Sequence, residues 1–181
     1  MSDQHTTELP SGELLRECLD YEAETGYLFW KERDFHTFEI VGKNVQRPLE
    51  TIAKNWNLRF AGKRAFASLS KGPVYIGRIR DTQYLTHRII YKMFHDHEFT
   101  DVRHKNLNTL DNRISNLYRA EDSEMVNRVI FLSSLRKYKV RGPDVNESFD
   151  TKNEAVECLN EVERNNPSSI QVDLSKFNNI I

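Results

Sequence analysis

The chain has 181 residues, of which 38% are hydrophobic and 29% charged, a composition that suits one or two small folded domains rather than a disordered chain. No apolar run approaches the roughly 20 residues that span a bilayer, and the N-terminal sequence lacks the basic and apolar regions of a signal peptide. We therefore expect a cytoplasmic protein without a membrane partner. The two cysteines, Cys18 and Cys158, are far apart in sequence, which argues against a disulfide framework and a cysteine-ligated zinc site.

The net charge of −1 hides an uneven distribution along the chain. Residues 1–26 carry one basic and seven acidic side chains, residues 27–140 carry 21 basic and 12 acidic ones, and residues 141–181 carry four basic and eight acidic ones. A basic middle between acidic ends is typical of a phosphate-binding surface to which acidic helices are attached, although charge also fluctuates along ordinary chains.

The first third of the chain predicts a small helix and sheet after a flexible N-terminus, residues 1–12. Leucines at helical spacing after Ser11 predict a helix over residues 13–20, with Ser11 as its cap. Strand formers after a Thr-Gly turn predict a strand near residues 25–31. Residues 32–55 are polar and weakly periodic, so we interpret them as a loop with local structure.

The basic middle of the chain predicts a sheet followed by a helix. Residues 60–66 and 74–80 bracket a Lys-Gly-Pro turn, and the second run alternates apolar with basic residues, which places Arg78 and Arg80 on the solvent face. A helix is expected over residues 85–94, with His87, Arg88 and Lys92 on its surface.

The second half of the chain predicts a hairpin and then alternating helices and strands. Residues 101–120 are rich in Asn and Asp and form the expected hairpin, followed by a helix from about 123 to 135. A basic strand at residues 136–143 precedes an acidic amphipathic helix from 152 to about 164. Residues 166–181 are expected to be a loosely attached tail.

Residues 102–117 resemble the HNH nuclease motif of phage-type homing endonucleases. The matched residues are His104, Asn106, Asp111, Asn112, Arg113, Asn116 and Leu117. The similarity extends over roughly residues 14–128, through the Gly26 turn, the Phe60-Ala61-Gly62-Lys63 run and the helix that precedes the hairpin. A phage or phage-derived mobile element in a bacterial cell is the origin that it suggests.

The C-terminal region carries a trace of a second resemblance. Residues 138–141, 149–151 and 154–155 resemble the end of the small sheet plus helix found in the DNA-binding modules of plant ethylene-response factors. The aromatic-rich first strands of that module are absent from this chain.

The HNH resemblance implies metal-assisted phosphodiester hydrolysis in a ββα-metal unit, here at about residues 101–132. His104 would be the general base, and Asn116 would brace the loop through hydrogen bonds to its backbone. One divalent ion, Mg²⁺ or Mn²⁺, would be held by an acidic residue before the base and by an Asn or His of the following helix.

The chain departs from this pattern at both metal positions. Arg103 stands before the base and Met125 stands at the second ligand position, and neither can bind a hard divalent ion. Leu107 replaces the usual turn glycine, so that the turn must avoid positive φ or accept strain. Other residues nearby could act as substitute ligands, and we therefore assign no metal residue. The candidates are Asp101, Asp111, Glu124 and Asn127.

Basic residues on the predicted strands and helices point to phosphate contact rather than to ordinary solvated charge. The expected DNA-binding residues are Arg78, Arg80, Arg88, Arg103, Arg113, Lys137, Lys139 and Arg141.

The sequence thus predicts an α+β protein with an HNH-endonuclease-like domain at residues 13–135 and a small DNA-binding-like module at 136–165. Its leading function is to bind double-stranded DNA by site occupation, as a repressor or competitor, with the metal site degenerate and no cofactor assigned unless the nuclease is active, when Mg²⁺ or Mn²⁺ is expected. An active HNH endonuclease that nicks or cuts DNA is the alternative. A protein-interaction module that uses its acidic ends is a third interpretation, and a homodimer is left open.

Overall fold

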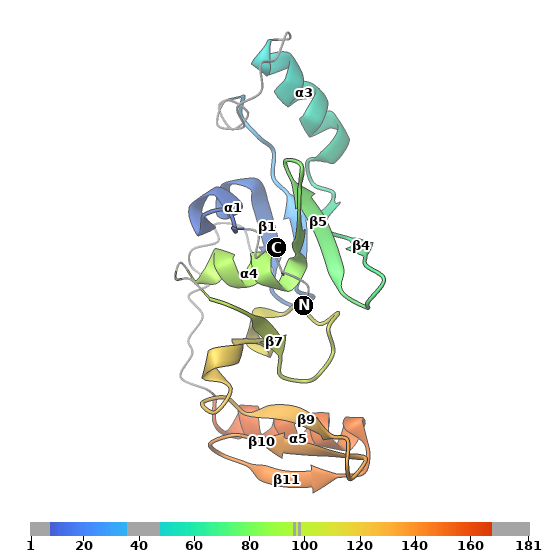
Figure 1. Ribbon diagram of the computed structural model, residues 1–181. Helices are drawn as coiled ribbons and strands as arrows, with labels where there is room; N and C mark the ends of the chain where they lie inside the picture. Colours follow the sequence, from blue (N-terminus) through green and yellow to red (C-terminus); the bar gives the residue numbers. More distant parts are fainter. Residues whose placement is uncertain (1–7, 36–47, 96, 98, 168–181) are drawn as a thin grey trace.

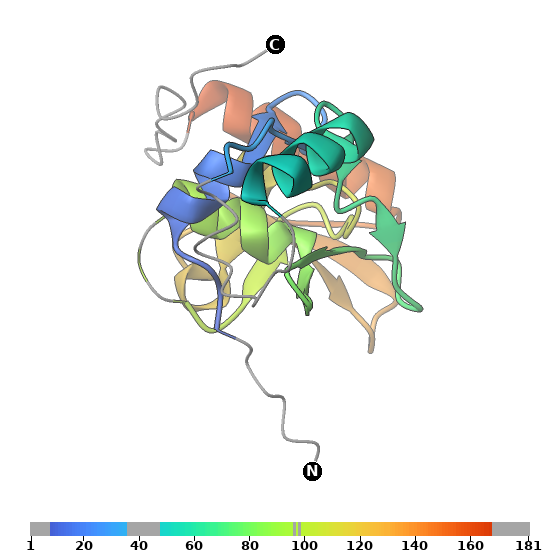
Figure 2. The same cartoon turned by 90° about the horizontal axis from the view of Figure 1, so that it is seen from above.

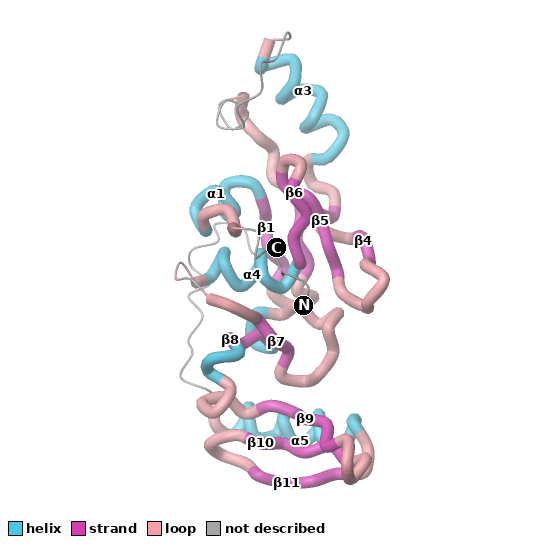
Figure 3. The backbone as a smooth tube through the Cα atoms, viewed as in Figure 1, coloured by secondary structure: helices cyan, strands magenta, loops and turns pink. Residues whose placement is uncertain are grey.

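The computed structural model describes residues 8–35, 48–95, 97 and 99–167. Helices and several small antiparallel sheets alternate along an elongated molecule, which agrees with the α+β class (Figure 1). Figure 3 shows how short most strands are. The elements up to the HNH-like motif are α1 (Gly12–Cys18), β1 (Leu19–Glu22), β2 (Tyr27–Trp30), α3 (Leu49–Phe60), β3 (Arg64–Ala65), β4 (Ser68–Leu69), β5 (Tyr75–Ile79), β6 (Thr82–Leu85) and α4 (Thr86–Phe94).

The remaining elements form the motif hairpin, made of β7 and β8, and a C-terminal sheet with one helix. They are β7 (Val102–His104), the 3-10 helix η1 (Ile114–Asn116), β8 (Leu117–Arg119), the 3-10 helix η2 (Ala120–Asp122), β9 (Arg128–Leu132), β10 (Lys137–Arg141), β11 (Asn146–Phe149) and α5 (Lys152–Asn165).

The first sheet has the order β1-β2-β3 and follows directly from α1. Ser11 accepts a hydrogen bond from the backbone N–H of Leu14 at 3.2 Å, which confirms it as the helix cap. The predicted strand near residues 25–31 is β2, and it pairs with β1 across the Gly26 turn. The sequence did not predict β1, because Leu19 continues the helical spacing of the leucines although it is the first residue of the strand.

The second sheet has the order β4-β5-β6 and leads into α4. The run at residues 60–66 does not join it, because β3 pairs with β2 instead. Arg78 lies exposed on β5 as predicted, but Arg80 occupies the β5–β6 turn at φ 57° rather than a strand. His87 and Lys92 were expected on the surface of α4, and both are buried.

Residues 49–60 form helix α3, which corrects the prediction of a loop over residues 32–55. The helix projects from the body of the molecule in Figure 1, and in Figure 2, which looks from above, it lies in front of the other elements. It is anchored by Trp56, whose ring meets the ring of Trp30 edge to face at 5.6 Å, and by Arg33, whose guanidinium lies over both rings.

The main core lies around α4, whose Ile89, Ile90 and Met93 are fully buried. Side chains of α1, β1 and β2 pack against it on one side, and Val102 and Leu117 of the motif hairpin pack on another. The motif hairpin is therefore part of this core rather than an appendage.

The largest correction concerns residues 123–135, where the sequence predicts the helix of a ββα unit. The structure has a turn at residues 123–125, after η2, and then strand β9, so the motif hairpin lacks the helix that would complete the unit. β9 joins β10 and β11 in a sheet of order β11-β10-β9, with α5 packed on one face. The expected basic strand is β10, and the expected acidic helix is α5. This sheet begins at Arg128, upstream of residue 136.

Candidate functional site

The motif hairpin pairs β7 with β8, with His104 opposite Leu117, and encloses the loop of residues 105–116. Asn116 holds this loop closed. Its side chain accepts a hydrogen bond from the N–H of Asn106 at 3.1 Å and donates to the carbonyl of Asp111 at 2.8 Å and to Oδ1 of Asn106 at 3.0 Å. Asn116 is 7% exposed, so these bonds form away from bulk water.

A second set of hydrogen bonds joins Arg113 and Asp111 within the same loop. Arg113 donates two hydrogen bonds to the carboxylate of Asp111, at 2.7 and 2.6 Å, and Asn106 donates a third at 2.7 Å. Burial acts to raise the pKa of Asp111, but the hydrogen bonds from Arg113 and Asn106 outweigh it and hold the pKa below its usual value. The side chains of Arg113 and Asp111 are therefore bonded to each other within the loop.

His104 is buried beneath α4 and is 7% exposed. Its Nε2 lies 3.1 Å from Oδ1 of Asn112, and its ring meets the ring of His87 edge to face, with 5.0 Å between centroids. Burial lowers the pKa of His104, and burial together with His104 lowers the pKa of His87 to about 3. The two rings form a buried neutral pair at neutral pH.

The two metal-ligand positions of the motif do not converge on His104. Arg103 follows the alternation of β7, so it points to the face opposite His104, is exposed, and pairs with Asp101 at 3.1 Å. Met125 lies in the turn before β9 and is 75% exposed. Among the residues that the structure describes, no group of three or more His, Cys, Asp or Glu is placed to hold a metal ion.

Each of the substitute ligands has another partner. Asp101 pairs with Arg103, and Asp111 pairs with Arg113. Glu124 contacts two arginines of the C-terminal sheet, and Asn127 is hydrogen-bonded to Asp144. The four candidate ligands therefore have separate partners and do not meet at one site.

Leu107, at the usual glycine position, adopts positive φ, which is the second of the two alternatives that the sequence left open. Its φ is 56°, in the left-handed region that disfavours a leucine by about 1 to 2 kcal/mol. Its carbonyl accepts a hydrogen bond from Nζ of Lys152 in α5 at 3.1 Å. The strained turn is thereby tied to the C-terminal helix.

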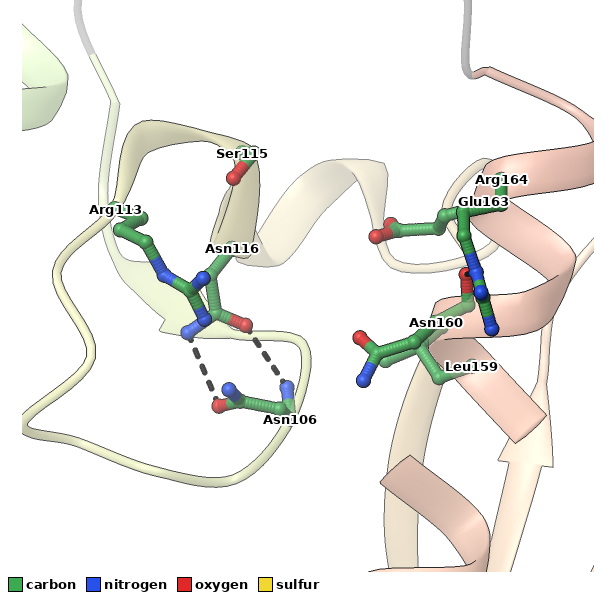
Figure 4. Close-up of a pocket in the computed structure, with 8 residues that line it drawn as sticks. All are labelled: Asn106, Arg113, Ser115, Asn116, Leu159, Asn160, Glu163 and Arg164. Atoms are coloured by element: carbon green, nitrogen blue, oxygen red, sulfur yellow. Dashed lines mark hydrogen bonds between the residues drawn. The ribbon is translucent and has the colours of Figure 1, made fainter. Parts of the chain in front are cut away.

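Helix α5 lies against the motif loop. Nζ of Lys105, which is 7% exposed at its side chain, sits 2.6 Å from the carboxylate of Glu163, and the N–H of Val129 donates to the carbonyl of Lys105 at 2.7 Å. Between loop and helix lies a cleft of about 420 Å³ (Figure 4). The loop residues that line it are Asn106, Arg113, Ser115 and Asn116, and the helix residues are Leu159, Asn160, Glu163 and Arg164.

The expected DNA-binding residues fall into separate groups. Lys137, Lys139 and Arg141 are brought together on β10, on the face away from α5, because Tyr138 and Val140 between them pack toward that helix. The others do not join that face. Arg78 and Arg80 lie on the second sheet and its turn, Arg88 lies half-buried over the ring of Phe99, Arg103 lies on β7, and Arg113 is held by Asp111.

Sequence reasoning missed Arg128, which the register places directly opposite Arg141. The signal was present, because Arg128 alternates with Val129 at the start of a run of strand formers. Because the same run also fits a helical period, the sequence assigns Arg128 to no face of a sheet.

Comparison of the chain with known protein families, with curated proteins and with solved structures returns no match. In the part of the chain that the structure describes, none of the helices has the length and apolar character needed to cross a membrane.

Proposed function

We propose that the protein binds double-stranded DNA through the outer face of the β9-β10-β11 sheet and occupies its site without cutting it. The chain would then be an HNH homing-endonuclease scaffold that has kept the motif hairpin and lost both its metal site and the helix of the ββα unit, as expected of a repressor or competitor. The observation that carries the proposal is the row of Lys137, Lys139 and Arg141 on one face of β10.

The geometry of this row suits a phosphate backbone. Alternate residues of a strand lie roughly 6.6 Å apart on one face, and several cations at such spacing can neutralise neighbouring phosphates. Lys139 forms no ion pair with the described residues, and Lys137 pairs only with the exposed Asp150, at 3.0 Å. A three-stranded antiparallel sheet with a helix on its other face also supports the resemblance to ethylene-response-factor modules.

The motif residues support binding without cleavage. A general base must reach the attacking water, whereas His104 is buried against His87 and Asn112. A divalent ion must be fixed beside the scissile phosphate, whereas Arg103 and Met125 lie exposed and apart from His104. The closed motif hairpin itself favours the alternative of an active HNH endonuclease, and a nicking assay separates the two.

The test is a gel-shift titration of a labelled duplex of about 30 base pairs at several salt concentrations. Replacing Lys137, Lys139 and Arg141 together with Ala should lower the affinity and reduce the slope of log K against log salt by up to about three. The matched control removes three exposed cations elsewhere: Lys54, Arg59 and Arg164.

The control variant should keep a slope close to that of the wild type. Equal losses in both triple variants would mean that net charge, rather than the sheet face, governs binding. If the wild type binds no duplex at low salt, the proposed function is wrong, and the acidic ends of the chain become the surface to test against basic protein partners.

A further inference from the structure

Arg128 and Arg141 occupy directly opposed positions at one end of the β9–β10 ladder. Both side chains lie on the face away from α5, because their neighbours Val129 and Val140 pack toward that helix. Like charges at opposed positions destabilise a strand pair, so an anion between the two guanidinium groups stabilises this arrangement.

Glu124 supplies that anion in the free protein. Its carboxylate lies 3.4 Å from a guanidinium nitrogen of Arg128 and 3.4 Å from one of Arg141. The side chain of Glu124 is 70% exposed, whereas that of Arg128 is 9% exposed. Glu124 thus approaches a nearly buried arginine from the solvent side, out of the turn that precedes β9.

Both contacts are long for charge-assisted hydrogen bonds, which are usually 2.7 to 2.9 Å. Elsewhere in the same chain, Arg113 and Arg119 each donate two bonds of 2.6 to 2.7 Å to one carboxylate. The other contact of Arg128, with the carbonyl of Val126, is also 3.4 Å. One carboxylate spread over two guanidinium groups leaves both of them able to take a stronger anion.

We propose that Arg128 and Arg141 form a binding site for one backbone phosphate of DNA, and that Glu124 occupies this site until DNA displaces it. The inference rests on the proposed function and adds a residue that sets affinity. A phosphate presents more acceptor oxygens than a carboxylate and can accept from two guanidinium groups at once.

The site lies at one end of the basic row on β10. Arg141 ends the row that begins at Lys137 and Lys139. The site is therefore continuous with the face through which the protein is proposed to bind DNA.

Glu124→Gln is the informative variant, because it keeps the size and the acceptor oxygen of the side chain and removes its charge. We expect it to bind a 30-base-pair duplex about threefold to tenfold more tightly than the wild type at low salt, since DNA no longer competes with a carboxylate. The matched control is Glu157→Gln, which removes one exposed charge from α5 on the opposite side of the sheet. It should change the affinity by less than about twofold.

A second pair of variants tests the mechanism. Arg141→Ala should weaken binding, and adding Glu124→Gln to it should restore less than the single change gains in the wild type, because half of the phosphate site is gone. Thermal unfolding of each variant provides a separate readout. Tighter DNA binding by Glu124→Gln together with equal or lower thermal stability supports the site.

Three results would overturn the inference: unchanged affinity in Glu124→Gln, a loss of both affinity and thermal stability, or an equal gain in Glu157→Gln. The second would make Glu124 a structural bridge only. These outcomes are distinct from failure of the proposed function, in which the wild type and every variant would bind no duplex at all.

Discussion

The motif loop and the outer face of the C-terminal sheet use polar side chains in opposite ways. In the loop, Asn116, Arg113 and Asp111 satisfy one another through short hydrogen bonds and His104 is buried. On the sheet, cations stand in a row with long or exposed partners. The polar groups of the motif loop are thus satisfied within the protein, whereas the cations of the sheet face are less fully paired.

The two regions also differ in how their cores are built. The core around α4 draws on many buried side chains, while the C-terminal sheet relies on Val129, Val140 and three residues around them, and on its contacts with α5. A small core of this kind is sensitive to the loss of one side chain.

Leu159→Ala tests whether the regions fold separately and should have the largest effect. Leu159 of α5 is 2% exposed, so its truncation should lower the free energy of unfolding of the sheet by about 3 kcal/mol. Both tryptophans, Trp30 and Trp56, lie in the region around the first sheet and α3, so urea unfolding followed by tryptophan fluorescence reports on that region alone. Far-UV circular dichroism reports on both.

A shift in the dichroism curve without a shift in fluorescence would show independent regions, and a common shift would show that the contacts of the motif loop with α5 and β9 couple them. Leu58→Ala is the matched control, because Leu58 is 75% exposed on α3. It should change stability by less than about 0.5 kcal/mol. An effect of Leu159→Ala as small as that of the control would contradict the packing of α5 on the sheet.

Local signals in the sequence predicted α1, β2, α4, β10 and α5, because each has a clear period together with a cap or turn residue. They failed at residues 123–135, where Val126, Val129 and Ile130 fit a helical period, yet the run pairs with β10. Pairing is a tertiary effect that a single period cannot reveal. Helix α3 was missed although Leu49, Ile52, Ala53 and Trp56 carry its spacing.

The site shows the same division between local and distant information. The hydrogen bonds of Asn116 and the strain at Leu107 follow from positions close in sequence. The burial of His104 by His87, and the contact of Lys105 with Glu163, join residues far apart in the chain. No spacing rule encodes such contacts.

The buried histidine pair makes the core around α4 sensitive to acid, while the sheet face should not be. The pKa of His87 is about 3 in the folded protein and about 6.5 in the unfolded chain, so unfolding takes up a proton below pH 6.5. Stability should therefore fall as the pH drops below 6.5, by about 2 kcal/mol at pH 5 from His87 alone. The lowered pKa of His104 acts in the same direction.

Urea unfolding at pH 7 and pH 5 measures this loss. His87→Phe keeps an aromatic ring against His104 and should remove much of the pH dependence, whereas the exposed His97→Gln should keep it. The same dependence in wild type and His87→Phe would mean that the histidine pair is not its source. Such a result would mean that the surroundings of His104 are hydrated, so that His104 could act as a base.

The smallest expected effect is that of restoring the two metal ligands, which should not restore cleavage. This variant distinguishes a site that has lost only its ligands from one that has also lost the geometry to bring them together. Arg103→Asp combined with Met125→Asn restores the ligand types of the HNH motif, yet we expect no nicking of bound plasmid in Mg²⁺ or Mn²⁺. The residue at position 103 points to the face opposite His104, and position 125 lies in an exposed turn where the motif would have a helix. The two ligands therefore cannot hold one ion beside the base, and the charge on a scissile phosphate would remain unbalanced. Gel shifts in the same buffers show that the plasmid is bound while it stays intact.

Nicking by the double variant alone would mean that the hairpin retains the active geometry and that only the ligands are missing. Nicking by the wild type, abolished by His104→Ala without loss of binding, would make the protein an endonuclease, because the buried His104 would then have to open to water during each cycle.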